Sequence, residues 1–252
     1  MKVVVLSSGS KGNTTYIETD NAKILIDAGN TCKYLMNKFI ELEINPQEID
    51  AIFVTHTHVD HIGGLKTLLK KINPCVYFTE KMRPYLEFIE NYRIILDDEI
   101  ILKDMIIEVI KTSHDTEDSV GYIINNCDKS VVYITDTGYI NRKYFDILKN
   151  RDFYIMESNH DIEMLNNSSY PFATRQRILS DKGHLSNYDS AKYLASFIGD
   201  KTKYVILAHL SHENNTIELA YETLRKRLDD ERIIFNNIII SKQNEETELI
   251  EI

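Results

Sequence analysis

The amino-acid sequence predicts an α/β protein folded as a four-layer αββα sandwich, in which two mixed β-sheets are flanked by helices. Short runs rich in β-branched residues recur along the chain, and segments with helical spacing lie between them. Strand candidates form hairpins early and late in the chain, with helices interleaved between them. This mixture of hairpins and alternating elements favours two mixed sheets covered by helices.

Eight runs are predicted to be strands because Val, Ile and aromatic residues dominate them. They lie at residues 3–6, 23–27, 51–55, 105–110, 120–124, 130–135, 153–156 and 204–208. The helical candidates, several of which begin after Ser, Thr or Asn capping residues, lie around residues 31–42, 61–72, 80–90, 141–149, 171–181, 188–199 and 214–229. Residues 232–252 are predicted to add two or three closing strands joined by a polar turn.

The length of 252 residues suits one substantial hydrophobic core, and no shift in composition marks a boundary. We therefore expect a single domain over residues 1–252. No apolar run approaches the length of a membrane span, and the opening MKVVVLSS has too few apolar residues for a signal-peptide core. We expect a soluble, cytoplasmic protein that does not contact a membrane.

Cysteine content and net charge limit the kinds of site that the chain can carry. Cys32, Cys75 and Cys127 are odd in number, widely spaced and outside any CxxC pair, so we expect buried thiols and neither a disulfide framework nor a thiolate zinc site. The net charge of -10 disfavours indiscriminate nucleic-acid binding, because phosphate affinity normally comes from an excess of Lys and Arg. Bound divalent metals reverse the local field, so a small anionic site remains compatible with this charge.

The stretch THTHVDHIGG, residues 55–64, holds three of the eight histidines of the chain and an aspartate within six positions. A predicted strand ends here and helical spacing begins, so His56, His58, Asp60 and His61 lie on the connecting loop and the first helical turn. His56 and His58 can face one way, and Asp60 and His61 another, so one loop could serve two ions. Imidazole and carboxylate ligands suit zinc, manganese or iron; the alternative is a polar, solvated loop rich in histidine.

Three more candidate ligands directly follow predicted apolar strands: His114 in TSHD, Asp136 in TDTG and His209 in AHLSHENN. Loops that leave one edge of a sheet converge, so we expect these side chains near the 55–64 loop. Taken singly, His114 and His209 also fit ordinary capping or hydrogen-bonding roles. Their joint placement favours a metal site.

This ordered set of side chains resembles the ligands of the metallo-β-lactamase fold superfamily over nearly the whole chain. The resemblance implies an αββα sandwich that binds two divalent metal ions, zinc or manganese. It places His56, His58 and His114 on one metal, Asp60, His61 and His209 on the other, and Asp136 between the two. Asp27 in LIDAG resembles an early aspartate motif of the superfamily and would support the ligands, although a turn residue before Gly29 is an equal alternative.

The resemblance also implies a class of reaction. Two metals about 3.5 to 4 Å apart lower the pKa of a shared water and stabilise the attacking and leaving oxygens, so we expect hydrolysis by a bridging hydroxide. The superfamily hydrolyses lactams and thioesters as well and, with iron, reduces oxygen or nitric oxide. The ligands by themselves therefore leave the substrate open.

A glutamate and further histidines supply candidate catalytic groups beside Asp60. Glu157 and His160 follow the predicted strand 153–156, and His184 precedes a predicted helix. Glu157 and His184 resemble the pair that donates a proton to the leaving oxygen in phosphodiesterases of this fold, such as the tRNA 3'-processing nucleases. A carboxylate raises the pKa of a neighbouring histidine and suits it to general acid catalysis. An ordinary loop before a helix cap is the alternative for His184.

The segments LSSGSKGNTTYI, ESNHD, GHLSN and HLSHENN together resemble a narrower bacterial branch, the WalJ (YycJ) proteins, which are similar to 5'-to-3' DNA exonucleases. Ser8, Ser10, Lys11 and Asn13 could bind phosphate beside the site, although SGSKGN is equally an ordinary hairpin turn. The segment between Asp136 and His209 is too short to contain the large inserted domain of the β-CASP nucleases. It also shows no obvious long arm for gripping tRNA.

These observations predict a metal-dependent phosphodiesterase, a 5'-to-3' exonuclease whose nucleic-acid substrate is DNA more than RNA. The first alternative is a metal-dependent hydrolase of a small ester, thioester or cyclic phosphodiester, which an acidic chain tolerates more readily. The second is a non-catalytic metal-binding regulatory module, although such a module has no need of an open bridging position between metals.

Overall fold

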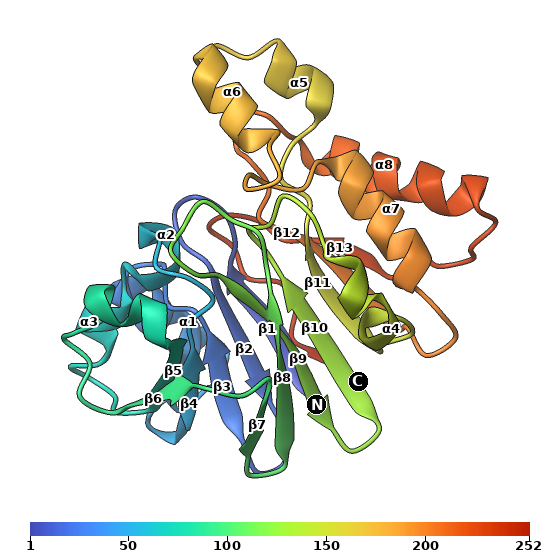
Figure 1. The fold of residues 1–252 in the computed structure, drawn as a ribbon. Helices are drawn as coiled ribbons and strands as arrows, with labels where there is room; N and C mark the ends of the chain where they lie inside the picture. The colour runs from blue at the N-terminus through green and yellow to red at the C-terminus, as the bar shows by residue number, and fades with distance from the viewer.

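The computed structural model describes residues 1–252 and contains two seven-stranded β-sheets packed face to face, with helices on both outer sides (Figure 1). The predicted αββα sandwich of two mixed sheets is confirmed. No helix is long and apolar enough to cross a membrane.

The first sheet has the strand order β14-β1-β2-β3-β4-β5-β6. Its strands are β1 Lys2–Ser7, β2 Thr14–Glu18, β3 Lys23–Ile26, β4 Ala51–Phe53, β5 Cys75–Thr79, β6 Tyr92–Ile95 and β14 Ile250–Glu251. Strands β14, β1, β2 and β3 pair antiparallel, whereas β3 to β6 run parallel. Because β14 pairs with β1, the two ends of the chain lie in the same sheet.

The second sheet has the strand order β13-β12-β11-β10-β9-β8-β7. Its strands are β7 Glu99–Leu102, β8 Met105–Lys111, β9 Val120–Asn126, β10 Lys129–Ile134, β11 Phe153–Glu157, β12 Tyr204–Ala208 and β13 Ile238–Ile240. Strands β7 to β10 form an antiparallel meander, and β10 to β13 run parallel. The carboxyl ends of β10, β11 and β12 therefore meet at one rim.

The helices cover the two outer faces. They are α1 Cys32–Glu41, α2 Val59–Ile62, α3 Leu65–Leu68, α4 Phe145–Leu148, α5 Ile162–Asn166, α6 Phe172–Ile178, α7 Asn187–Phe197 and α8 Ile217–Asp230, with 3-10 turns η1 Pro46–Glu48, η2 Glu80–Tyr85 and η3 Arg142–Tyr144. The three longest helices begin at capping side chains, because Thr31, Ser186 and Thr216 each accept a hydrogen bond from a backbone N–H of the first turn.

Two apolar layers follow from the alternation of side chains along the strands. On β10, Val131 and Tyr133 face the layer between the sheets, whereas Val132 and Ile134 face the helices. The inner layer continues around the first sheet to α1 and α3, and it contains 42 buried apolar residues against 19 in the outer one. The inner layer is therefore the main core, and it holds the strand ends at the rim in fixed positions.

The eight predicted strands are all present, but four strands escaped sequence reasoning, namely β2, β5, β6 and β7. Each has only four or five residues, too few for a periodic pattern to stand out. Residues 232–252 supply two strands, β13 and β14, but these join different sheets instead of closing one.

Two predicted helices are wrong in extent. The helix expected over residues 61–72 is split into α2 and α3 at Gly63 and Gly64. A Cβ on Gly64 would lie 2.0 Å from the carbonyl oxygen of Asn30, so the loop after β3 packs directly against the helix backbone at that point. The helix expected over residues 80–90 is only the 3-10 turn η2, which contains Pro84, a residue that cannot continue an α-helical ladder.

Helices α5 and α6 project beyond the layers of the sandwich as a short arm, residues 162–178 (Figure 1). The helix predicted at 171–181 is present as α6, but nothing in the sequence indicated α5 or the short projecting arm. Leu165 is the only buried residue of α5 and Ile178 the only one of α6. With one anchor each, these helices have no apolar stripe from which sequence periodicity could place them.

The prediction of buried thiols holds for Cys32 alone. Cys75 is half-buried, and Cys127 is exposed in the turn between β9 and β10, where its φ is 51°. All three cysteines are unpaired, as expected.

We expect Tyr154→Phe to lower the free energy of unfolding by about 1–3 kcal/mol, because removing this fully buried hydroxyl would leave its partners without a hydrogen bond. The Tyr154 hydroxyl donates to the carbonyl oxygens of Leu148 and Phe197, at 2.7 and 3.0 Å, and accepts from the backbone N–H of Arg151 at 2.9 Å. Equilibrium denaturation in urea measures the loss. The exposed Tyr85→Phe is the matched control and should change stability by less than about 0.5 kcal/mol; equal effects would contradict the assignment.

Candidate metal centre

The predicted metal-binding side chains lie where strands end at one rim of the sandwich. Neighbouring parallel strands bring their carboxyl ends together, as β3 pairs with β4, β10 with β11 and β11 with β12. Asp27, Asp136 and His209, which follow β3, β10 and β12, have φ values of 61°, 54° and 57°. A left-handed backbone costs a residue with a Cβ about 1–3 kcal/mol, and such conformations concentrate at functional sites.

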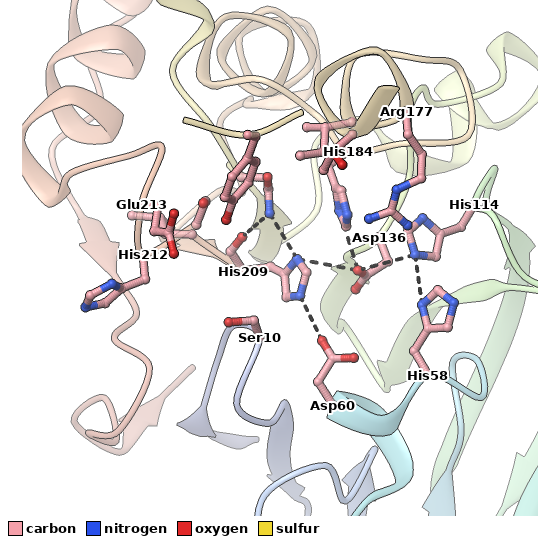
Figure 2. A pocket seen from close by; sticks show the side chains of 16 residues that line it. Ser10, His58, Asp60, His114, Asp136, Arg177, His184, His209, His212 and Glu213 are labelled. Atoms are coloured by element: carbon pink, nitrogen blue, oxygen red, sulfur yellow. Dashed lines mark hydrogen bonds and ion pairs between the residues drawn. The ribbon is translucent and has the colours of Figure 1, made fainter. Parts of the chain in front are cut away.

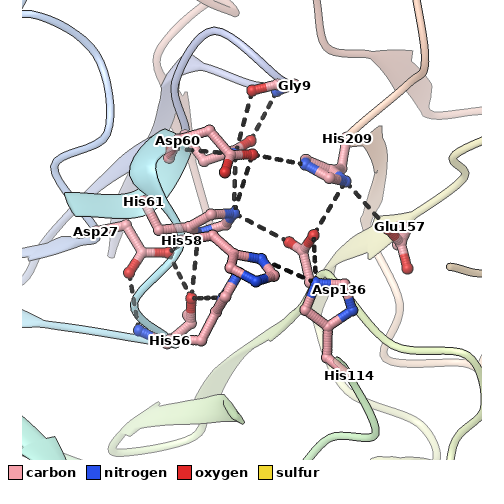
Figure 3. A network of polar contacts seen from close by, with 12 residues as sticks. Gly9, Asp27, His56, His58, Asp60, His61, His114, Asp136, Glu157 and His209 are labelled. Carbon is pink, nitrogen blue, oxygen red and sulfur yellow. Dashed lines mark hydrogen bonds and ion pairs between the residues drawn. The ribbon is translucent and has the colours of Figure 1, made fainter. Parts of the chain in front are cut away.

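The donor atoms form four overlapping clusters, within each of which all candidate ligand atoms lie within 4.8 Å of one another. The clusters are His56, His58 and His114; Asp60, His61 and His209; His56, His61 and Asp136; and Asp136, Glu157, His184 and His209. All seven side chains predicted as metal ligands are therefore brought together (Figure 3). Their roles as ligands stay a prediction.

The first cluster consists of three imidazoles from two loops. The Nε2 atom of His114 lies 3.2 Å from Nδ1 of His58, and Nε2 of His56 is buried without a hydrogen-bond partner. The Nδ1 atom of His114 lies 3.1 Å from the carbonyl oxygen of Gly183. A hydrogen bond to that carbonyl puts the proton on Nδ1 and leaves Nε2 free as a ligand atom.

The second cluster adds a carboxylate from the turn of α2. One Asp60 carboxylate oxygen lies 3.4 Å from Nε2 of His209 and 3.6 Å from Nε2 of His61. The backbone N–H of Asn13 donates to the Asp60 carbonyl at 2.7 Å. Gly29 lies so close to that carbonyl oxygen that a Cβ would be 1.7 Å from it. Only glycine fits at position 29, and its close packing fixes the turn that presents Asp60.

Asp136 lies between the two clusters. Its carboxylate oxygens lie 3.1 Å from Nε2 of His61, 3.4 Å from Nδ1 of His209 and 3.8 Å from Nε2 of His114 (Figure 3). Burial alone would raise the pKa of Asp136, but the neighbouring His209 and His61 outweigh it and hold the pKa well below the usual range. Burial likewise opposes a charge on His61, but Asp136 and Asp27 raise the pKa of His61 to about 10. The electrostatic field of these carboxylates therefore favours positive charge at the centre of the clusters.

These residues fit a pair of divalent cations. His56 Nε2 and Asp136 Oδ2 are buried and make no hydrogen bond, which leaves both atoms free to ligate an ion. Every donor in the clusters is an imidazole nitrogen or a carboxylate oxygen, the set that suits zinc or manganese.

Asp27 supports this donor set from behind. One of its oxygens lies 2.7 Å from Nδ1 of His61, and Thr55 donates to the same carboxylate from its backbone N–H at 2.8 Å and its hydroxyl at 2.7 Å. Burial raises the pKa of Asp27, and the contacts with His61 and Thr55 oppose that shift. Asp27 also turns the chain at positive φ, as the alternative from the sequence expects, and its role in supporting metal ligands stays a prediction.

Glu157 and His184 form the pair that the sequence suggested. One Glu157 oxygen lies 2.7 Å from Nδ1 of His184 and 3.1 Å from Nδ1 of His209. The other accepts from the backbone N–H groups of Thr137 and Leu185, at 3.0 and 3.1 Å. Burial opposes a charge on both partners, but their mutual attraction is stronger, so the pKa of His184 is raised and that of Glu157 falls to about 2.

The remaining candidates lie in different surroundings. His160 is buried, neither ring nitrogen has a hydrogen-bond partner, and it does not line the cavity. Asn13 lies 3.0 Å from Nε2 of His61 through its side-chain amide. Ser8 accepts a hydrogen bond from the backbone N–H of His209 at 2.7 Å, Ser10 lines the cavity, and Lys11 is exposed outside it.

A cavity of about 360 Å³ opens over the clusters (Figure 2). One end contains His58, Asp60, His114, Asp136, His184 and His209, and the arm forms a wall with Tyr170, Thr174, Arg177 and Ile178. Sequence reasoning missed these arm residues and also Asn159, Ser211, His212 and Glu213. Asn159, Ser211, His212 and Glu213 lie inside the quoted motifs ESNHD and HLSHENN, whereas the arm residues lie in none and reach the site through tertiary packing.

Two mixed sheets between helices, with histidine and aspartate side chains gathered at one strand-end rim, define a metallo-β-lactamase fold. A family model described as the β-lactamase superfamily domain matches residues 22–209, which is most of the chain. The chain belongs to the β-lactamase superfamily, and it is a metal-dependent hydrolase. The resemblance inferred from the sequence is confirmed.

Relatives and solved structures agree with this family. The chain is 39% identical over 236 residues to exodeoxyribonuclease WalJ of Streptococcus pneumoniae, and 37% identical over 233 residues to exodeoxyribonuclease YycJ of Bacillus anthracis. Each alignment covers 90% of this chain and 88% of the relative. The metallo-β-lactamase fold protein YhfI of Bacillus subtilis matches with a TM-score of 0.72 at 16% identity, over 98% of this chain and 99% of that one.

We expect the purified protein to bind about two equivalents of manganese or zinc, as two groups of ligands require. His58→Ala should reduce this to about one equivalent, because His58 belongs only to the first cluster. Asp136→Ala should weaken both sites, because its carboxylate lies within 4 Å of His114 in the first cluster and of His61 and His209 in the second. Elemental analysis after dialysis measures the metal. His212→Ala, a cavity histidine outside the clusters, is the control; equal loss there would refute the assignment.

Asp27→Asn should weaken metal binding by about 10–100-fold, because a carboxylate behind a ligating imidazole fixes its orientation and increases its basicity. Titration with a competing chelator measures the affinity, and thermal unfolding in excess metal separates it from a loss of folding. Unchanged affinity would leave Asp27 as a turn residue only.

Proposed function

We propose that this protein is a two-metal phosphodiesterase that removes nucleotides from the 5' end of DNA. The observation that carries the proposal is the convergence of six further donor side chains around Asp136, directly beside the Glu157–His184 pair. Relatives named exodeoxyribonucleases, at 39% and 37% identity over 90% of the chain, support nuclease chemistry and a DNA substrate. The 5'-to-3' direction and the cytoplasmic location rest on the sequence analysis.

In this proposal His56, His58 and His114 would hold one metal and Asp60, His61 and His209 the other, and Asp136, which lies between the two groups, would be a further ligand. When bound, two divalent ions lower the pKa of a shared water and stabilise charge on the attacking and leaving oxygens. The chain contributes the fixed geometry, because the ligands stand on strand ends braced by the main core.

Glu157 and His184 supply the proton for the leaving oxygen. Glu157 accepts two backbone hydrogen bonds, so its carboxylate is held rigidly and binds Nδ1 of His184. This leaves Nε2 of His184 as the ring atom available to the cavity that His184 lines. A histidine whose pKa is raised keeps its proton to a higher pH than a free histidine does, and it can protonate an alkoxide as it departs.

A second candidate function is hydrolysis of a small phosphodiester such as a cyclic nucleotide. The observation that favours it is the size of the cavity, about 360 Å³, which falls in the range of small-molecule sites.

Digestion of 5'- and 3'-labelled single- and double-stranded DNA and RNA, with manganese and then zinc, tests the proposal. We expect mononucleotide release from the 5' end of DNA, no activity in Asp60→Ala, and a loss of about 10²–10⁴-fold in kcat for Glu157→Gln and His184→Ala. The exposed Glu163→Gln is the matched control for Glu157→Gln and should stay fully active. Turnover of cyclic nucleotides without any release from DNA would favour the second candidate instead.

A further inference from the structure

The arm contributes one face of helix α6 and the turn before it to the cavity. The arm residues that line the cavity are Tyr170, Thr174, Arg177 and Ile178, at spacings of four, three and one residues. These positions share one side of a helix. Arg175, two residues before Arg177, does not line the cavity and instead donates to the carbonyl oxygen of Asn166 within the arm.

Arg177 is the only Lys or Arg among the residues that line the cavity. Asp60, Asp136 and Glu213 line it too, so the remaining permanent charges there are negative. An arginine fork presents several N–H donors in a plane and matches the oxygens of a phosphate group. In this cavity Arg177 is thus the one side chain with both the charge and the geometry to bind phosphate.

Asp115 holds Arg177 at the metal end of the cavity. Nη1 of Arg177 donates to one Asp115 carboxylate oxygen. The other oxygen is buried without a hydrogen-bond partner, 3.3 Å from Nε2 of His114 and 4.0 Å from Nε2 of His58. Only Nη1 of the guanidinium has a partner in the chain, and the side chain is 55% exposed. Its other donors are free to meet a ligand beside the first cluster (Figure 2).

The end of α6 packs against the loop that contains Gly183 and His184. The Ile178 carbonyl accepts from the backbone N–H of His184 at 3.0 Å, and Nδ1 of His114 lies 3.1 Å from the Gly183 carbonyl oxygen. A Cβ on Gly183 would lie 2.0 Å from the Ile178 carbonyl oxygen, so these two segments are in close backbone contact. Arg177 therefore keeps a fixed position relative to both His114 and His184.

We propose that Arg177 binds a phosphate group of the substrate next to the first metal cluster, and that Asp115 is the residue that positions its guanidinium. The inference rests on the proposed function and extends it by assigning substrate recognition to the arm. Because such a contact is made equally before and during bond cleavage, Arg177 contributes to KM more than to kcat.

The test compares the manganese-loaded full-length enzyme with Arg177→Met, Arg177→Lys, Asp115→Ala and the double variant on a 5'-phosphorylated single-stranded oligodeoxynucleotide. Arg177→Met should raise KM roughly ten- to a hundredfold with kcat changed by less than about threefold. Arg177→Lys should recover part of this loss. Asp115→Ala should raise KM by roughly threefold, and adding it to Arg177→Met should have no further effect, because the two residues act as one unit.

Arg175→Met is the matched control, since it removes the same charge from the same helix outside the cavity. If Arg177 contacts a phosphate, the slope of log Kd against log salt should be smaller by about 0.7 for Arg177→Met than for wild type, as measured by fluorescence anisotropy. Neutral methylphosphonate linkages, introduced into the oligonucleotide one at a time, should weaken its binding to wild-type protein at one position. The linkage at that position should not change the binding to Arg177→Met. Metal content must stay constant in all variants.

The outcomes separate the two proposals. Equal KM and salt slopes for Arg177→Met and Arg175→Met, in an enzyme that digests DNA, would overturn the role of Arg177 alone. Wild-type protein that binds the oligonucleotide without cutting it would overturn the proposed function, and the affinities of the two variants would still decide the role of Arg177. Protein that neither binds nor cuts DNA would overturn both.

Discussion

One buried carboxylate, that of Asp136, lies within 4 Å of imidazoles from four different segments, and much of the structure serves to hold it there. Bringing this many polar groups into an apolar interior is costly unless each is paired or binds an ion. The sandwich meets this requirement by letting parallel strands end at one rim, where short loops point their side chains to a common centre. The positive φ values of Asp27, Asp136 and His209 are local strain that the core offsets.

Around that centre, a second layer of contacts fixes each donor. Asp27 and Thr55 hold His61, Glu157 holds His184, and the Gly183 carbonyl orients His114. The Gly183 contact has a wider consequence, because Gly183 and His184 follow the arm in sequence and pack against the end of α6. The metal clusters, the candidate proton donor and the cavity wall are therefore parts of one connected unit.

Some structural details fell outside sequence reasoning for identifiable reasons. Strands such as β5 are too short to show a period, and the pattern over residues 61–72 hides a break at Gly63 and Gly64 that depends on the loop around Asn30. The arm helices bury one residue each, so hydrophobic periodicity could not locate them. The pair of Asp115 and Arg177 was not predicted, because Arg177 lies in no recognisable motif and 61 residues separate it from Asp115, the last residue of TSHD.

The sequence by itself determined eight of the strands, most of the longer helices, the residue types at the strand ends and the likeness to a metal-dependent family, because these depend on local spacing and composition. Only the tertiary structure decided which of these side chains meet. Glu157 and His184 form a pair, whereas His160, just as prominent in the sequence, lies buried outside the cavity. The difference lies in backbone geometry: strand register and loop packing set the direction of each side chain, and spacing along the chain does not encode that direction.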